Sequence, residues 1–139
     1  MKNVYFAIVF IGLLFFISCS SSKVQNSAGS LTSNKWELLT LAGKTLDANA
    51  TKMGTPSLMF SAEYGLTGHT GCNTFTGTYK LENGKLSLEP GAITKMFCVD
   101  SPEIEFLSAL KQTNGYKISG GELSLLNGTA ELMKFISKK

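Results

Sequence analysis

The sequence predicts a mainly β domain with an α+β tendency: a small antiparallel, barrel-like sheet of about eight strands with one helix near residues 102–114. Three observations lead to this fold class. Two segments alternate apolar and polar residues beside an Asn-Gly pair, as hairpin strands do. Further short apolar segments recur between glycine, proline and asparagine residues. Only one segment of the domain repeats its apolar residues at helical spacing.

The N-terminus has the pattern of a targeting segment. Residues 4–17 form an apolar run that is shorter than the roughly 20 residues of a membrane span and resembles the hydrophobic part of a signal peptide. A small residue and Cys19 end the run as in a bacterial lipobox. We therefore predict that residues 1–18 are removed and that Cys19 is lipidated, for example with palmitate. An uncleaved signal anchor and a plain secretory signal are the alternatives.

The serine-rich residues 19–33 are predicted to form a lipidated N-terminus and flexible tether, which leaves residues 34–139 as the domain. No acidic cluster follows Cys19, and this favours an orientation that faces the periplasm. We expect a bacterial cell-envelope protein that is held in the outer membrane by its acyl chains, with the lipid membrane as its first partner.

The predicted strands follow one another through the domain. The Asn-Gly pairs at 83–84 and 127–128 suit type I′ hairpin turns. Closing or nearly closing the sheet would remove exposed edges, and the apolar residues are numerous enough to favour a filled interior over a hollow one. The segments are 35–41, 57–61, 65–70, 75–82, 85–89, 92–97, 116–119, 122–125 and 130–136.

The helix is predicted to begin at Ser101, a typical N-cap, with Pro102 in its first turn, and to end at the Asn-Gly pair 114–115. Glu103 and Glu105 fall in the first turn, where they suit the positive end of the helix dipole. The apolar side of the helix has a three-residue spacing, through Ile104, Leu107 and Leu110.

Two cysteines remain in the domain once Cys19 is assigned to the lipid anchor. In an oxidising compartment, Cys72 and Cys98 are expected to form a disulfide that is worth about 3–4 kcal/mol by the chain-entropy estimate. Two buried free thiols or a redox-active pair are the alternatives. The spacing is not that of a Cys-x-x-Cys motif, so nothing supports a thioredoxin-like role.

Residues 68–79 read GHTGCNTFTGTY, and residues 94–98 read TKMFC. These segments resemble the G-x-x-G-C-N-x-F-x-G-x-Y signature and the T-x-M-x-C element of the META domain family, to which HslJ-like heat-shock proteins belong. Phe97 departs from the alanine that is common in that element. The residues that carry the resemblance are Gly71, Cys72, Asn73, Phe75, Gly77, Tyr79, Thr94, Met96, Cys98, Glu103 and Phe106.

The resemblance spans residues 34–136 and implies a small β-barrel-like fold with one helix. It also implies an association with heat shock and envelope stress, without an established reaction.

Composition excludes several function classes. The 13 basic residues are scattered among 10 acidic ones and form no stripe for nucleic acid. One histidine and three cysteines do not supply a zinc site, so no metal or cofactor is expected. His69 has no nucleophile tied to it by a motif, and Glu103 and Glu105 point in different directions, so no catalytic residues are predicted.

Asn73, Thr74, Thr94 and Lys95 form a candidate binding rim, because the expected disulfide would bring their segments together. The alternative for Asn73 is a side chain that caps a turn. The expected function is a non-enzymatic, membrane-anchored envelope lipoprotein that binds a protein partner or supports the envelope stress response. A small-ligand carrier and an inhibitor of a hydrolase remain as alternatives, and the sequence leaves the oligomeric state open.

Overall fold

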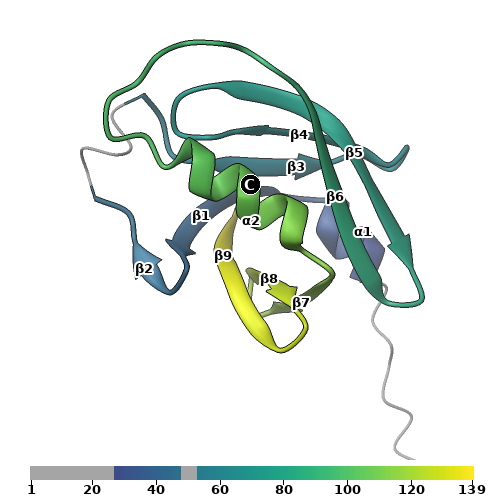
Figure 1. The fold of residues 1–139 in the computed structure, drawn as a ribbon. Helices are drawn as coiled ribbons and strands as arrows, with labels where there is room; N and C mark the ends of the chain where they lie inside the picture. Colours follow the sequence, from purple (N-terminus) through teal and green to yellow (C-terminus); the bar gives the residue numbers. More distant parts are fainter. Residues whose placement is uncertain (1–26, 48–52) are drawn as a thin grey trace, which may run out of the picture.

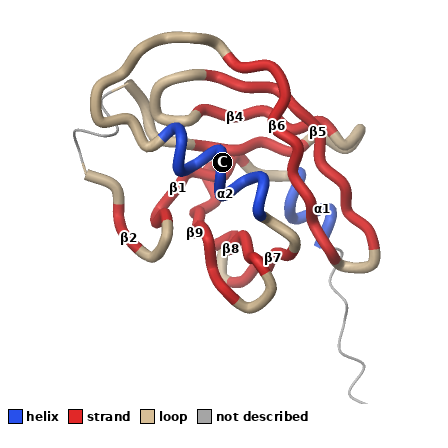
Figure 2. The backbone as a smooth tube through the Cα atoms, viewed as in Figure 1, coloured by secondary structure: helices blue, strands red, loops and turns tan. Residues whose placement is uncertain are grey.

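The computed structural model describes residues 27–47 and 53–139. The predicted signal peptide, Cys19 and most of the predicted tether lie outside these residues. Figures 1 and 2 show a strongly curled sheet with two helices. The elements are α1 (Ser27–Thr32), β1 (Lys35–Leu41), β2 (Lys44–Thr45), β3 (Ser57–Phe60), β4 (Gly65–His69), β5 (Thr74–Glu82), β6 (Lys85–Ile93), α2 (Glu103–Gln112), β7 (Gly115–Ser119), β8 (Glu122–Asn127) and β9 (Ala130–Lys138).

The sheet is an antiparallel half-barrel, which confirms the predicted fold class. Its strand order is β6-β5-β4-β3-β1-β9-β8-β7, and the short β2 pairs with β1. The end strands β6 and β7 are not hydrogen-bonded to each other in this order, so the sheet curls without closing into a barrel. Figure 1 shows α2 lying across the concave side of the sheet.

The concave side is filled by side chains, as the composition favours. Phe106 of α2 has no exposed surface and lies between Phe75 and Phe135, with ring centroids 6.4 and 6.3 Å apart and edge-to-face geometry. Helix α2 is therefore a core element of the fold. Around these rings pack other fully buried residues, among them Trp36, Leu31, Leu58, Leu66, Leu86, Leu88, Leu110, Leu123, Leu125 and Met133.

The N-terminal boundary of the domain differs from the prediction. Residues 27–33 were expected in the flexible tether, yet they form α1 and its end, and Leu31 is completely buried. The Trp36 indole N–H donates to the Leu31 carbonyl oxygen over 2.9 Å. A single leucine in a serine-rich stretch gives no periodicity to detect, so composition alone missed this second helix.

Strand β6 also differs from the prediction. The separate strands expected at 85–89 and 92–97 are one strand that runs through Pro90 to Ile93, and residues 94–97 lie in a loop instead. Pro90 is tolerated because β6 is an end strand with an irregular register. The opposing residue must be Gly77, since a Cβ there would lie 2.2 Å from the Glu89 carbonyl oxygen.

Two hairpin turns and the helix ends can be compared with their sequence signals. Asn83 and Gly84 both have positive φ, as a type I′ turn requires, but the second hairpin turns one residue later, at 128–129, with Gly128 at positive φ. The predicted helix start is wrong by one residue: α2 begins at Glu103, and Pro102 rather than Ser101 is the N-cap residue. The Ser101 hydroxyl still accepts from the Glu103 N–H over 3.2 Å. Helix α2 ends at Gln112, slightly before the predicted Asn-Gly stop.

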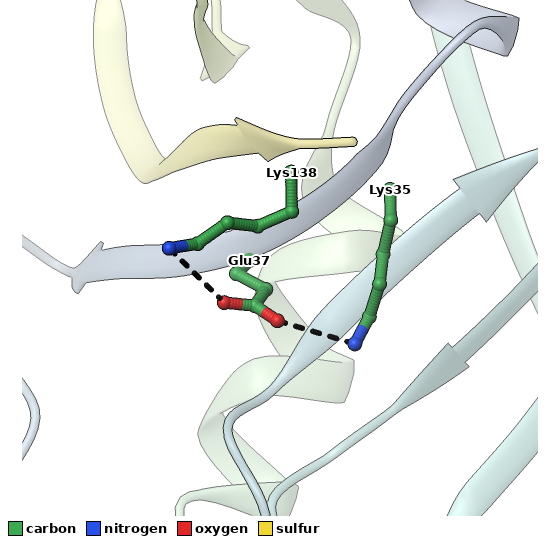
Figure 3. A network of polar contacts seen from close by, with 3 residues as sticks. All are labelled: Lys35, Glu37 and Lys138. Carbon is green, nitrogen blue, oxygen red and sulfur yellow. Dashed lines mark hydrogen bonds and ion pairs between the residues drawn. The ribbon is translucent and has the colours of Figure 1, made fainter.

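Two central strands of the sheet, β1 and β9, carry a small ion-pair network, shown in Figure 3. Glu37 of β1 lies between Lys35, at 3.2 Å, and Lys138 of β9, at 3.9 Å. All three side chains are partly exposed, so the network contributes little to stability. It explains the charges on these two strands without a functional role.

Candidate functional site

The site that sequence analysis singled out is built around a disulfide. Cys72, in the turn between β4 and β5, is bonded to Cys98, which lies in the loop between β6 and α2. Their Cα atoms are 5.9 Å apart. The predicted pairing is therefore present. The disulfide links residues 94–102, which we call the 94–102 loop, covalently to the β4–β5 turn at the end of the sheet.

Asn73 holds the same loop in place through hydrogen bonds of its side chain. Its side-chain Oδ1 accepts from the Thr94 hydroxyl over 2.8 Å and from the Met96 N–H over 2.7 Å. Its Nδ2 donates to the Met96 carbonyl oxygen over 3.1 Å and to Glu103 Oε2 over 2.9 Å. Asn73 is only 1% exposed, so its amide is used entirely within the fold.

Thr70 and Glu103 complete this buried polar cluster. The Thr70 hydroxyl donates to Glu103 Oε2 over 2.6 Å and accepts from the Asn73 N–H over 2.9 Å, and Thr70 is fully buried. The carboxylate of Glu103 thus joins the first turn of α2 to the β4–β5 turn. Sequence reasoning gave Glu103 only a helix-dipole role, and its place in the family pattern was the one signal that marked it.

The predicted binding rim does not form one accessible surface. Asn73 is buried, whereas Thr74 and Lys95 are exposed. Thr94 is exposed as a residue, but its hydroxyl is held by Asn73 and accepts from the Thr74 N–H over 3.2 Å. The Asn73 side chain does cap backbone groups, as the alternative proposed. The capped groups are the N–H and carbonyl of Met96 in the loop rather than groups of its own turn.

His69 and the signature glycines have structural explanations. The His69 Nδ1 accepts from the Gly71 N–H over 3.0 Å, and this bond fixes the β4–β5 turn. A Cβ at Gly68 would lie 2.4 Å from the Ser57 carbonyl oxygen and 2.6 Å from the Phe75 ring. The glycine at 68 therefore allows β3, β4 and the core ring to approach closely, and no phosphate-binding role is needed to explain it.

Tyr79, the last residue of the signature, also serves the fold. Its hydroxyl donates to the Ser61 carbonyl oxygen over 2.8 Å, and its ring packs edge-on against Phe60 with centroids 5.2 Å apart. Burial raises the pKa of the Tyr79 phenol, and the neighbouring Tyr64 and Glu63 raise it further. The phenol is thus held in its neutral, hydrogen-bonded form.

The loop that these contacts hold presents apolar side chains to solvent. Phe97 is 92% exposed and Val99 is 72% exposed. Met96 of the loop is 51% exposed, and Ile104 in the first turn of α2 is 88% exposed. We call these four residues the apolar loop patch. Sequence analysis missed it, because it assigned residues 92–97 to a strand and Ile104 to the apolar side of the helix.

Other kinds of site receive no support from the part of the chain that the structure describes. Over residues 27–47 and 53–139, no three His, Cys, Asp or Glu side chains gather into a possible metal site. No helix in those residues is long and apolar enough to cross a membrane.

The fold and the site together define a small, disulfide-bonded β half-barrel with a clamped loop. The family model of the META domain matches residues 29–139, and this chain belongs to the META domain family. The match begins within α1, in agreement with the structural boundary of the domain.

Solved structures show the same fold. The NMR structure of a protein from Burkholderia xenovorans has a TM-score of 0.60 and 24% identity, covering 82% of this chain and 89% of that chain. A second NMR structure of a protein has a TM-score of 0.58 and 24% identity, with 76% and 91% coverage. The crystal structure of a DUF4847 family protein from Bacteroides vulgatus has a TM-score of 0.55 and 16% identity, with 76% and 93% coverage. No curated protein sequence matches the chain.

Replacing Asn73 by alanine is expected to lower the free energy of unfolding by about 2–3 kcal/mol, because it removes four hydrogen bonds and leaves buried partners unsatisfied. Urea denaturation measures this effect. The control is Thr74→Ala, an exposed neighbour, for which the expected change is below about 0.5 kcal/mol. Equal stability of the two variants would show that the hydrogen bonds of the Asn73 side chain do not stabilise the fold.

Proposed function

We propose that this protein is a non-enzymatic, membrane-anchored envelope lipoprotein whose META domain binds a protein partner, and that it acts in the envelope stress response. Family membership supports an envelope-associated protein. The lipid anchor, the partner and the stress role are our proposals. The observation that carries the binding role is the apolar loop patch, which the disulfide and Asn73 hold in a position exposed to solvent.

The internal use of the polar signature residues supports binding over catalysis. Asn73, Thr70 and Glu103 are hydrogen-bonded to one another or to the loop backbone, and they are not arranged around an accessible nucleophile. A catalytic group must be able to reach a substrate atom. What this end of the domain offers to another molecule is a surface of apolar side chains.

The packing of the half-barrel also bears on the alternative of a small-ligand carrier. A carrier needs unfilled interior space, yet Phe106, Phe135 and Trp36 occupy the concave side with at most 1% exposure. The inhibitor alternative remains as a special case of partner binding. It is favoured specifically by Phe97, which projects from a disulfide-held loop as a cleft-entering group would.

The anchor is tested by replacing Cys19. Cys19→Ser is expected to abolish incorporation of labelled palmitate, because Cys19 is the proposed site of acylation. Cys98→Ser is the matched control and should keep the label. Full palmitate labelling of Cys19→Ser would contradict a lipid anchor at this residue.

Partner binding is tested by photocrosslinking in intact cells. A photoreactive residue is placed in the full-length protein at Thr74 or at Val99, both exposed at the clamped end, and in parallel at Glu82 near the β5–β6 turn. We expect one recurrent envelope protein to be trapped from the first two positions and not from Glu82. Absence of any protein adduct at Thr74 and Val99 would contradict the proposed function.

A further inference from the structure

We infer that Phe97 is the anchor with which the 94–102 loop enters an apolar pocket of a partner protein, and that the rim of this pocket is basic. This inference rests on the proposed function and names its surface and the chemistry of its partner. It is carried by the exposure of Phe97, by the way the loop is closed, and by the charges around the patch.

The first observation is how much apolar surface the loop leaves in water. Phe97 is 92% exposed, Val99 is 72% exposed and Ile104 is 88% exposed. Single exposed apolar residues are ordinary, but several large ones on one short segment mark an interaction site. A phenylalanine that projects almost completely fits a concave pocket better than a flat surface, and buried aromatic anchors dominate the energy of many interfaces.

The second observation is that the loop is closed at its base. Asn73 Nδ2 donates hydrogen bonds to the Met96 carbonyl oxygen, where the loop begins to project, and to the Glu103 carboxylate, where α2 begins. Cys98 is bonded to Cys72 between these two points. Phe97 and Val99 therefore lie on a segment whose backbone is fixed by a disulfide and by hydrogen bonds. A pre-organised segment loses less conformational entropy on binding, so the same contacts give a higher affinity.

The third observation is the charge around the patch, which favours a protein over a lipid surface. The exposed charged residues of the loop are Lys95 and Asp100, and Glu105 follows in the first turn of α2, so acidic groups outnumber basic ones. An anionic lipid surface attracts basic segments and disfavours acidic ones. A basic rim on a protein pocket would complement Asp100 and Glu105.

Figure 1 shows the loop arching over the part of the domain away from α1, so this helix leaves the loop open to a partner.

The test uses the full-length protein in intact cells, with the photoreactive residue at Val99. Phe97→Ser is expected to reduce the protein adduct at least tenfold, because it removes the anchor ring. Met59→Ser is the matched control, since Met59 of β3 is 52% exposed and lies outside the patch, and the adduct should stay within about twofold of the wild type. Glu105→Lys should lower the yield several-fold through charge repulsion at the rim.

Folding is checked separately on the purified variants. Because Phe97 is almost fully exposed, the thermal midpoint of Phe97→Ser should stay within about 4 °C of the wild type. This agreement would assign a lost adduct to lost binding rather than to unfolding.

Several results would overturn the inference. A protein adduct that Phe97→Ser leaves unchanged, or one that appears only from Thr74, would leave partner binding in place and remove Phe97 as the anchor. An adduct to lipid or to a second copy of this chain would show a different occupant of the patch. A higher yield with Glu105→Lys would contradict the basic rim. Absence of adducts from both positions would contradict the proposed function as well.

Discussion

Phe106→Ala is expected to lower the free energy of unfolding by about 3–5 kcal/mol, as large-to-small changes at buried aromatic residues do. The ring is fully buried and touches the ring systems of β5 and β9 through Phe75 and Phe135. Its removal leaves a cavity between α2 and the sheet that the surrounding strands cannot close without breaking their pairing. Denaturant unfolding followed by the fluorescence of Trp36 measures the loss.

The neighbouring Ile104→Ala provides the control for this prediction. Ile104 lies on the same helix but is 88% exposed, so its replacement should change stability by less than about 0.5 kcal/mol. The contrast separates the loss of core packing from a general effect on the helix. If Phe106→Ala were as stable as Ile104→Ala, the helix would not be part of the core.

Removing the disulfide is the second large effect. Cys98→Ser should cost about 3.5 kcal/mol, the chain-entropy value for cysteines 26 residues apart in the sequence. The cost is large for a small domain, whose total stability is about 5–15 kcal/mol. The measurement is the urea midpoint of the variant against that of the wild type under oxidising conditions.

A reductant gives this prediction its internal control. Dithiothreitol should lower the midpoint of the wild type to about that of Cys98→Ser and should leave the variant unchanged, because the variant has no bond to reduce. A wild-type midpoint that is insensitive to full reduction would show that the disulfide contributes nothing to the stability of the fold.

Much of the fold can be predicted because its signals are local. The Asn-Gly pair at 83–84 has the positive φ angles that its type I′ turn requires, and the alternation after it places Leu86 and Leu88 in the core. The errors arise where long-range contacts decide. Leu31 is buried in the same core as Trp36, whose indole N–H donates to the Leu31 carbonyl oxygen, and β6 continues through Pro90 because Gly77 allows the close approach of β5.

The candidate site is harder to predict, because its partners are distant in the sequence. The disulfide follows from counting cysteines, but Asn73 and Glu103 are 30 residues apart and no local pattern reports their hydrogen bond. The exposure of Phe97 is likewise invisible to periodicity, since an apolar residue beside Met96 suggests a strand. Only the fold shows that this segment is a loop.

Asn73 holds the 94–102 loop in one conformation. Amide hydrogen exchange at Met96 tests it most directly, because the Met96 N–H has Asn73 Oδ1 as its acceptor at 2.7 Å and lies outside any strand. We predict that this amide is protected in the wild type and that Asn73→Ala abolishes the protection while the amide of Leu123 in β8 stays protected. Exchange of the wild-type Met96 amide at the rate of an unstructured peptide would contradict the account.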